Sequence, residues 1–155
     1  MTAVNATGFS SMRANYTFGT PTMGVAGSFY RLCWSHDPVL LSDYNVEVDA
    51  SVDLAGPFPR HLECTLGLHC LVALQGYRLS STNRMVVVSN GSVCGDADPI
   101  VANDTWTNTN ASDIANDTLS ANYSLGTPLV GVPGSYFRLC WGHDPVNMRD
   151  YNVEV

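Results

Sequence analysis

Hydrophobic and polar residues alternate along residues 44–54. The apolar positions are Tyr44, Val46, Val48, Ala50, Val52 and Leu54, and a polar residue occupies every position between them. A period of two is typical of a β-strand that buries one face. We therefore expect one half-buried strand that spans the whole of this stretch.

Further strands are predicted at 69–79, 84–89, 121–128 and 134–141, where β-branched and aromatic residues gather between turn-forming residues. Gly and Pro interrupt every candidate amphipathic helix, so the sequence predicts no helix of substantial length. The pattern indicates an all-β protein, most simply a β-sandwich of about seven strands per unit.

A long stretch of the sequence occurs twice. Residues 14–48 and residues 121–155 align without a gap, and 24 of the 35 aligned positions are identical. The copies start at 14 and at 121, so the repeat period is about 107 residues. This period is too long for a helical solenoid and close to the roughly 100 residues of an immunoglobulin-type sandwich. We therefore expect tandem, disulfide-bonded, immunoglobulin-like β-sandwich repeats of about 107 residues.

The repeat divides the chain into units. Residues 1–42 would be the C-terminal part of a preceding unit, residues 43–145 one complete β-sandwich unit, and residues 146–155 the start of the next. Because both ends fall inside a repeat, we expect the sequence to be a window cut from a longer polypeptide. Only four residues, VLLS or VNMR, separate HDP from DYNVEV in each copy. Such a short connection favours a stiff rod over beads on a flexible string.

The charge excludes one class of partner. The formal net charge is −7, and all seven basic residues are arginines. Binding to nucleic acid needs a basic patch, so we expect no nucleic-acid partner. The absence of lysine excludes Schiff-base chemistry by this stretch of chain. No apolar run is long enough to cross a bilayer, so we expect no membrane-spanning segment within these residues.

Acceptor patterns for N-glycosylation are dense. The N-x-[ST] pattern occurs at Asn5, Asn15, Asn90, Asn103, Asn110, Asn116 and Asn122. A chain rich in Asn and Thr can create such patterns by accident, but the acceptor at Asn15 recurs at its equivalent position, Asn122. We therefore expect covalent N-linked glycans on exposed loops. This in turn predicts an extracellular or cell-surface location, reached through the secretory pathway.

Residues 103–123 carry four of these acceptors and contain no charged residue other than Asp. Such a composition does not build a core of its own, so we expect a long, sugar-coated surface excursion. Trp106 would either stack on a glycan or hold the loop against the domain, and we favour the second role.

Five cysteines are an odd number for a secreted chain, but the repeat resolves the count. Cys33 and Cys140 occupy the same position in successive copies, so one period contains Cys64, Cys70, Cys94 and Cys140. Four cysteines allow three connectivities. We expect a Cys64–Cys70 disulfide, closing a short turn, and a Cys94–Cys140 disulfide, joining two strands. The partner of Cys33 would then be the counterpart of Cys94 in the preceding unit, one full period earlier.

Adjacent histidine and aspartate residues, His36 with Asp37 and His143 with Asp144, are the candidate parts of a catalytic triad. Neighbouring side chains on an extended chain point apart, so they do not form a base with its orienting carboxylate. The pair also recurs in each copy, which is uncommon for an active site, and no nucleophile elbow or phosphate-binding loop is present. We expect no catalytic residues and no enzymatic activity.

Two groups of residues suggest metal ligands. The first is His61, Cys64, His69 and Cys70, whose spacing matches no zinc module. In an oxidising compartment, moreover, thiols pair with one another. The second group would suit calcium at the unit junctions and in a DxD pair: Asp37, Asp43, Asp96, Asp98, Asp144 and Asp150. We favour solvated turn aspartates and therefore expect no metal and no cofactor.

Three short motifs carry a resemblance to a known family: GSFYRLCW at 27–34, CTLGLHC at 64–70 and NGSVCG at 90–95. Their combination resembles repeats in large cell-surface glycoproteins of algae and other protists, including proteins similar to those of flagellar mastigonemes. The resemblance covers essentially the whole unit. It implies an extracellular, glycosylated, filament- or coat-forming role and supplies no catalytic residue.

These features predict a structural, N-glycosylated repeat protein that forms an extracellular fibril or cell-surface appendage, with neighbouring copies of itself as partners. The alternative is an adhesion or recognition ectodomain whose loops bind a ligand. A unit built for recognition should diverge from its neighbours in exposed aromatic or charged residues. The near identity of 14–48 and 121–155 favours the structural role.

Overall fold

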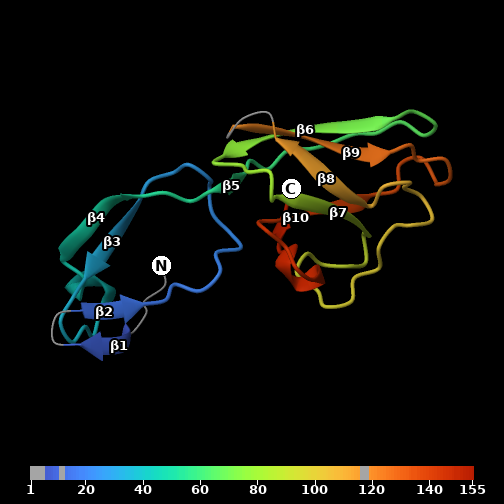
Figure 1. Cartoon of the computed structure of the whole chain (residues 1–155). Coiled ribbons are helices and arrows are strands. Elements are labelled where there is room, and N and C mark those ends of the chain that lie inside the picture. The colour runs from blue at the N-terminus through green and yellow to red at the C-terminus, as the bar shows by residue number, and fades with distance from the viewer. Residues whose placement is uncertain (1–5, 11–12, 116–118) are drawn as a thin grey trace.

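The computed structural model of the chain describes residues 6–10, 13–115 and 119–155 (Figure 1). The predicted all-β class is confirmed. In these described ranges the helical elements are two single 3-10 turns, η1 (Leu41–Asp43) and η2 (Met148–Asp150). The strands are β1 (Ala6–Ser10), β2 (Arg13–Tyr16), β3 (Tyr30–Trp34), β4 (Val46–Val52), β5 (Gly56–Pro57), β6 (Cys70–Tyr77), β7 (Arg84–Ser89), β8 (Asn110–Ala115), β9 (Ser120–Gly126), β10 (Phe137–Gly142) and β11 (Val153–Glu154).

Seven strands form one antiparallel sheet in the order β11-β10-β7-β8-β9-β6-β5. β8 connects two parts of this sheet, because its first residues pair with β7 and its last residues pair with β9. Ala111 lies opposite Met85, and Ile114 lies opposite Asn122. A strand that is shared in this way turns a corner, so the sheet folds over a common core.

The main core lies between the two parts of the sheet. Its buried residues are Cys70, Val72, Leu74, Leu79, Met85, Val87, Ala102, Trp106, Ala111, Ala121, Tyr123, Leu125 and Trp141. β6 and β9 bury every second residue, as expected for strands with one face on a core. Each large apolar side chain that is fully buried stabilises the fold by about 1.5–3 kcal/mol.

β7 is buried on both faces. Met85 and Val87 belong to the main core, whereas Val86 and Val88 pack with Cys140 and Tyr151 in a second cluster. An uninterrupted apolar run is the pattern typical of a strand covered on both sides. We call the seven-stranded sheet and its loops, residues 56–115 and 119–155, the main body of the protein. The main body is therefore organised around β7 and its neighbour β10.

Gly76 in β6 is required by the close approach of β5. A Cβ atom at this position would overlap the carbonyl oxygen of Gly56 and would lie 2.9 Å from a methyl carbon of Leu79. Both approaches are closer than van der Waals contact allows. The pairing of Pro57 with Gly76 therefore depends on the missing side chain.

The part of the chain from β1 to β4 forms two hairpins. β1 pairs with β2, and β3 pairs with β4 (Figure 1). The indole N–H of Trp34 donates a hydrogen bond to the hydroxyl of Tyr16 (3.1 Å), which joins the hairpins. In the alignment of the two copies, β2, β3 and β4 correspond to β9, β10 and β11.

Four of the predicted strands are present. The stretches 69–79, 84–89, 121–128 and 134–141 appear as β6, β7, β9 and β10. Their ends differ from the predicted ends by at most three residues. Clusters of β-branched and aromatic residues between turn-forming residues therefore locate these strands well.

The strand predicted at 44–54 is shorter than expected and is not half-buried. β4 covers residues 46–52, and all seven of its side chains are exposed. Within residues 6–10, 13–115 and 119–155 it pairs only with β3, and the exposure of its side chains shows that no described element covers its apolar face. The sequence does alternate and gives β4 one apolar face, but that face stays exposed in this structure.

The expectation of a surface excursion at 103–123 is wrong. β8 and the first half of β9 lie in this stretch, in the middle of the main sheet. Ala111, Ala121 and Tyr123 are fully buried. The composition misleads because apolar residues alternate with Asn and Ser along β9, so one face of this strand is polar while the other enters the core. The preference for Trp106 as a residue that holds the loop is confirmed, because Trp106 belongs to the main core.

Candidate assembly site

The candidate site is the strand-and-turn motif that occurs in both copies of the repeat. In the first copy, β3 runs through η1 into β4, and in the second copy β10 runs through η2 into β11. Trp34 lies opposite Val46, as Trp141 lies opposite Val153. Each strand that follows the turn thus pairs with the strand that precedes it. β4, in the segment from residue 43, is therefore hydrogen-bonded to β3, and β11, in the segment from residue 146, is hydrogen-bonded to β10.

Side chains in the two copies make the same contacts. Arg31 forms an ion pair with Glu47 at 2.9 Å, and Arg138 forms one with Glu154 at 2.6 Å. The rings of Trp34 and His36 lie 6.3 Å apart at 34°, and the equivalent rings in the second copy have the same geometry. Equal sequence therefore produces equal local structure at two places with different surroundings.

One carboxylate closes each turn. In the first copy Asp43 accepts hydrogen bonds from the backbone N–H groups of Leu40 (2.8 Å) and Val39 (2.9 Å). In the second copy Asp150 accepts them from Asn147 (2.9 Å) and Val146 (2.8 Å). These bonds, led by those from Leu40 and Asn147, lower the pKa of both carboxyl groups below the usual value. The connection between strands is thus a closed turn held by its own backbone.

The HDP segment begins this turn with an unusual backbone conformation. Asp37 has φ of 54° and Asp144 has φ of 51°, both in the left-handed region. Asp is among the few residues other than Gly that enter this region readily. His143 does not contact Asp144 as a triad would require; its Nδ1 lies 2.7 Å from Nδ2 of the buried Asn83.

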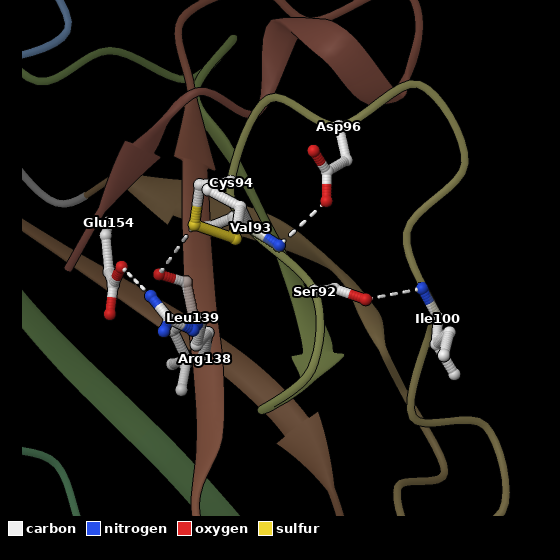
Figure 2. Close-up of a disulfide and its surroundings, with 9 residues drawn as sticks. Ser92, Val93, Cys94, Asp96, Ile100, Arg138, Leu139 and Glu154 are labelled. Carbon is white, nitrogen blue, oxygen red and sulfur yellow. Dashed lines mark hydrogen bonds and ion pairs between the residues drawn. A yellow bond between two sulfur atoms is a disulfide. The ribbon is translucent and has the colours of Figure 1, made fainter.

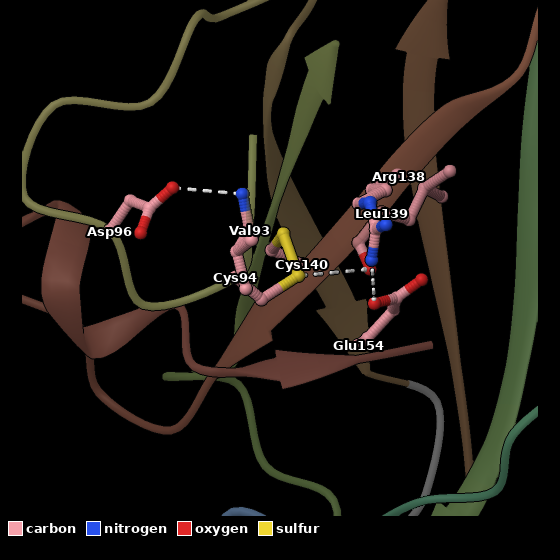
Figure 3. A network of polar contacts seen from close by, with 7 residues as sticks. All are labelled: Val93, Cys94, Asp96, Arg138, Leu139, Cys140 and Glu154. Atoms are coloured by element: carbon pink, nitrogen blue, oxygen red, sulfur yellow. Dashed lines mark hydrogen bonds and ion pairs between the residues drawn. A yellow bond between two sulfur atoms is a disulfide. The ribbon is translucent and has the colours of Figure 1, made fainter. Parts of the chain in front are cut away.

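Two disulfides lie in the main body. They join Cys64 to Cys70 and Cys94 to Cys140, the same pairs that the sequence predicts. Figure 2 shows Cys94 in the loop after β7, where Val93 N–H donates to Asp96 (2.8 Å) and Ile100 N–H donates to Ser92 (2.8 Å). Figure 3 shows the same bridge beside the Arg138–Glu154 ion pair. Disulfides form and persist in an oxidising environment.

A separate group of contacts joins the N-terminal hairpins to the main body. Asp53, which follows β4, accepts a hydrogen bond from the Tyr77 hydroxyl (3.0 Å) and pairs with Arg78 (2.8 Å). Gly27 packs on the ring of Tyr77, where an added Cβ would lie 3.2 Å away, and its N–H donates to Leu54 (2.7 Å). We call these five residues, Gly27, Asp53, Leu54, Tyr77 and Arg78, the junction contacts.

Beside the junction contacts lies an open groove of about 660 Å³. Residues 20–24 and 54–57 line one side, and the turn of the second copy, including His143 and Asp144, lines the other. The loop of the first copy therefore lies near the turn of the second.

The structure describes five of the seven predicted glycosylation acceptors. Asn15, Asn90, Asn103 and Asn110 are exposed, and Asn122 is half-buried on β9. Asn103 accepts a hydrogen bond from Thr109 and Asn110 accepts one from Tyr151, both through Oδ1. Their Nδ2 atoms, to which a glycan would attach, are not used in these bonds. Asn5 and Asn116 lie outside the described residues.

The candidate metal ligands are placed apart or are already engaged. Within residues 6–10, 13–115 and 119–155, no group of three or more His, Cys, Asp or Glu side chains is close enough to hold a metal ion. Cys64 and Cys70 share a disulfide, and His61 lies near Glu63 (3.4 Å). Asp96 caps the turn at Val93, as Asp43 and Asp150 cap theirs.

Sequence reasoning missed the junction contacts and the Asn83–His143 contact. Arg78 has φ of 52°, which nothing in its neighbouring residues signals. Asn83 lies 60 residues from His143, so only the folded sheet brings them together. Gly27 and its equivalent Gly134 both have positive φ, 74° and 84°, so the shared glycine signals the turn and not the contact with Tyr77.

Comparison of the chain with protein-family profiles, with curated proteins and with solved structures finds no match. In the part of the chain that the structure describes, no helix has the length and apolar character needed to span a membrane.

Proposed function

We propose that this is a structural, N-glycosylated repeat protein that forms an extracellular fibril or cell-surface appendage. The observation that carries the proposal is the agreement between the two copies of the motif. A turn that closes on itself and a strand that returns to its neighbour form a module that is suited to repetition. The main body, built around β7 and β10, would be an immunoglobulin-like sandwich of such an array.

The strand pairing suggests where one unit ends. Since β4 hydrogen-bonds to β3, we place the boundary between units after β4, near Asp53, rather than before residue 43. The next unit then begins with β5. The junction contacts lie at this boundary and would hold neighbouring units at one angle, as a stiff fibril requires.

The proposed location is outside the cell, reached through the secretory pathway. The two disulfides support it, and so does the exposure of four acceptor asparagines.

Each disulfide would stabilise the unit by about 2–4 kcal/mol. Glycans would hydrate the surface and hinder association of sheet edges. Asp43 and Asp150 already bind backbone N–H groups, so the proposed turns require no calcium.

One observation favours the alternative, an adhesion or recognition ectodomain. The loop at 129–136 exposes Leu129, Val130, Val132 and Tyr136 and contains no acceptor pattern. An exposed apolar loop free of glycans suits a ligand-binding surface. Its counterpart at 22–29 also exposes Met23, Val25 and Phe29. A feature present in each copy also suits lateral contacts in a fibril, so we keep the structural role first.

Electron microscopy of the native material tests the proposal. We expect filaments with an axial repeat of one domain length in negative stain. Intact-mass measurement before and after enzymatic glycan removal should show a large loss. Dispersed short particles with little sugar would contradict the structural role and favour the adhesion ectodomain.

A further inference from the structure

The second copy of the motif shows β10 with a strand on each side. β11 lies along one edge and β7 along the other. Opposite β7, Leu139 faces Val87, Cys140 faces Val86 and Trp141 faces Met85. Cys94 lies in the loop that follows β7 and forms the disulfide to Cys140. In this setting Cys140 is 1% exposed and Trp141 is 5% exposed.

The first copy keeps one side of this arrangement and lacks the other. β4 pairs with β3 as β11 pairs with β10, with Cys33 opposite Glu47 and Cys140 opposite Glu154. Among the described residues, no strand lies along the other edge of β3. Cys33 is a free, exposed thiol, and Trp34 is 40% exposed.

We propose that the open edge of β3 receives a strand of the type found at residues 84–94, supplied by a repeat unit other than the one that contains Cys94, and that the cysteine ending this segment forms a disulfide with Cys33. The second copy specifies the register. A residue equivalent to Val86 would lie opposite Cys33, and one equivalent to Met85 would lie opposite Trp34. The incoming strand would bury Trp34 as β7 buries Trp141.

Physical chemistry favours this occupant. An open strand edge presents unpaired N–H and C=O groups, which an added antiparallel strand satisfies. The apolar run Met-Val-Val-Val suits an edge whose neighbouring aromatic side chains are exposed. Formation of the disulfide removes two protons and two electrons from the two thiols. A disulfide oxidant such as oxidised glutathione accepts them and is itself reduced to two thiols.

A peptide of residues 82–96 tests the inference on the whole chain. The chain and the peptide are mixed in a buffer of reduced and oxidised glutathione, and peptide mapping by mass spectrometry measures the mixed disulfide at Cys33. A scrambled peptide that keeps the cysteine at the same position is the matched control. Because strand pairing raises the local concentration of the thiol, we expect about tenfold more mixed disulfide with the native order. The Cys33→Ser chain should show none.

A second peptide separates strand addition from thiol reactivity. The Cys94→Ser version of the peptide is unable to form the disulfide, yet it should slow hydrogen exchange at the amides of β3. Equal capture of native and scrambled peptides, or a predominant disulfide between two Cys33 residues, would overturn the inference. So would unchanged exchange in β3.

The inference rests on the proposed function only for the existence of further repeat units. The two are therefore tested apart. Filaments that form without selective capture of the peptide at Cys33 would overturn the inference and keep the proposed fibril. Selective capture in a protein that forms no filaments would keep the strand site and remove the fibril.

Discussion

Asp37 and Asp144 show how one residue type supports a conformation that most side chains avoid. Their φ values, 54° and 51°, both lie in the left-handed region. This region costs ordinary side chains about 1–2 kcal/mol, and Asp is among the residues that tolerate it best. Backbone geometry alone is therefore enough to explain each aspartate in HDP.

Substitutions at Asp144 should follow this backbone requirement. Asp144→Gly should leave the free energy of unfolding nearly unchanged, because Gly adopts positive φ without strain. Asp144→Ala should lower it by about 1 kcal/mol. Urea unfolding of the oxidised protein measures both values. An equal loss in the two variants would instead assign the effect to the carboxylate.

The turn carboxylates should make stability depend on pH. Their pKa values in the folded protein lie below the ordinary value of 3.8, because backbone N–H groups bind the ionised form. The stabilisation is present above the unfolded pKa and is lost as pH falls through the folded pKa. Asp150→Asn should therefore lose less stability than the parent between about pH 5 and about pH 2. Thermal unfolding across this range is the measurement, and parallel curves would contradict the assignment.

At the scale of elements, the close pairing of β5 with β6 offers a sharp test. Gly76→Ala places a Cβ against the Gly56 carbonyl and should lower the free energy of unfolding by about 1–3 kcal/mol or more. Gly91→Ala is the matched control, since nothing lies within 4 Å of its Cβ position. The control should change stability by less than about 0.5 kcal/mol. Urea unfolding that finds equal effects would show that the strands separate easily.

Strand positions were predictable because β-branched and aromatic residues gather between turn-forming residues. β7 matches its predicted range at both ends. Burial was not predictable for β4, because an apolar face becomes buried only when another layer covers it. For β9 the polar outer face concealed buried residues such as Tyr123, and only the pairing partners reveal this.

At the scale of the whole molecule, the junction contacts should fix the angle between the N-terminal hairpins and the main body. The Arg78→Ala variant removes the ion pair to Asp53 and should broaden the distribution of distances between the two parts. Small-angle X-ray scattering should record a larger maximum dimension with unchanged secondary structure by circular dichroism. Arg149→Ala, on the exposed surface of η2, is the control and should match the parent.

The candidate site was readable from the sequence only in its repeated part. Counting cysteines in one period gives four that can pair, the short turn between Cys64 and Cys70 favours the pairing that the structure has, and Cys33 stands out as the remainder. The junction contacts could not be predicted, because Asp53 and Tyr77 are brought together by the path of β5 and β6. The open edge of β3 likewise follows from topology, which a list of strands does not contain.

The Cys94–Cys140 bridge has a consequence for a chain under tension. The cysteines it joins are 46 apart in sequence, with β8 and β9 between them, and those of the Cys64–Cys70 bridge are 6 apart. Together the two bridges prevent about half of the residues in one period from extending under a pulling force. At about 3.5 Å per residue, an unravelling unit would lengthen to about 190 Å instead of about 370 Å. The bridges would therefore limit the extension of each unit, and a fibril of the kind we propose would stiffen after about half of its extension.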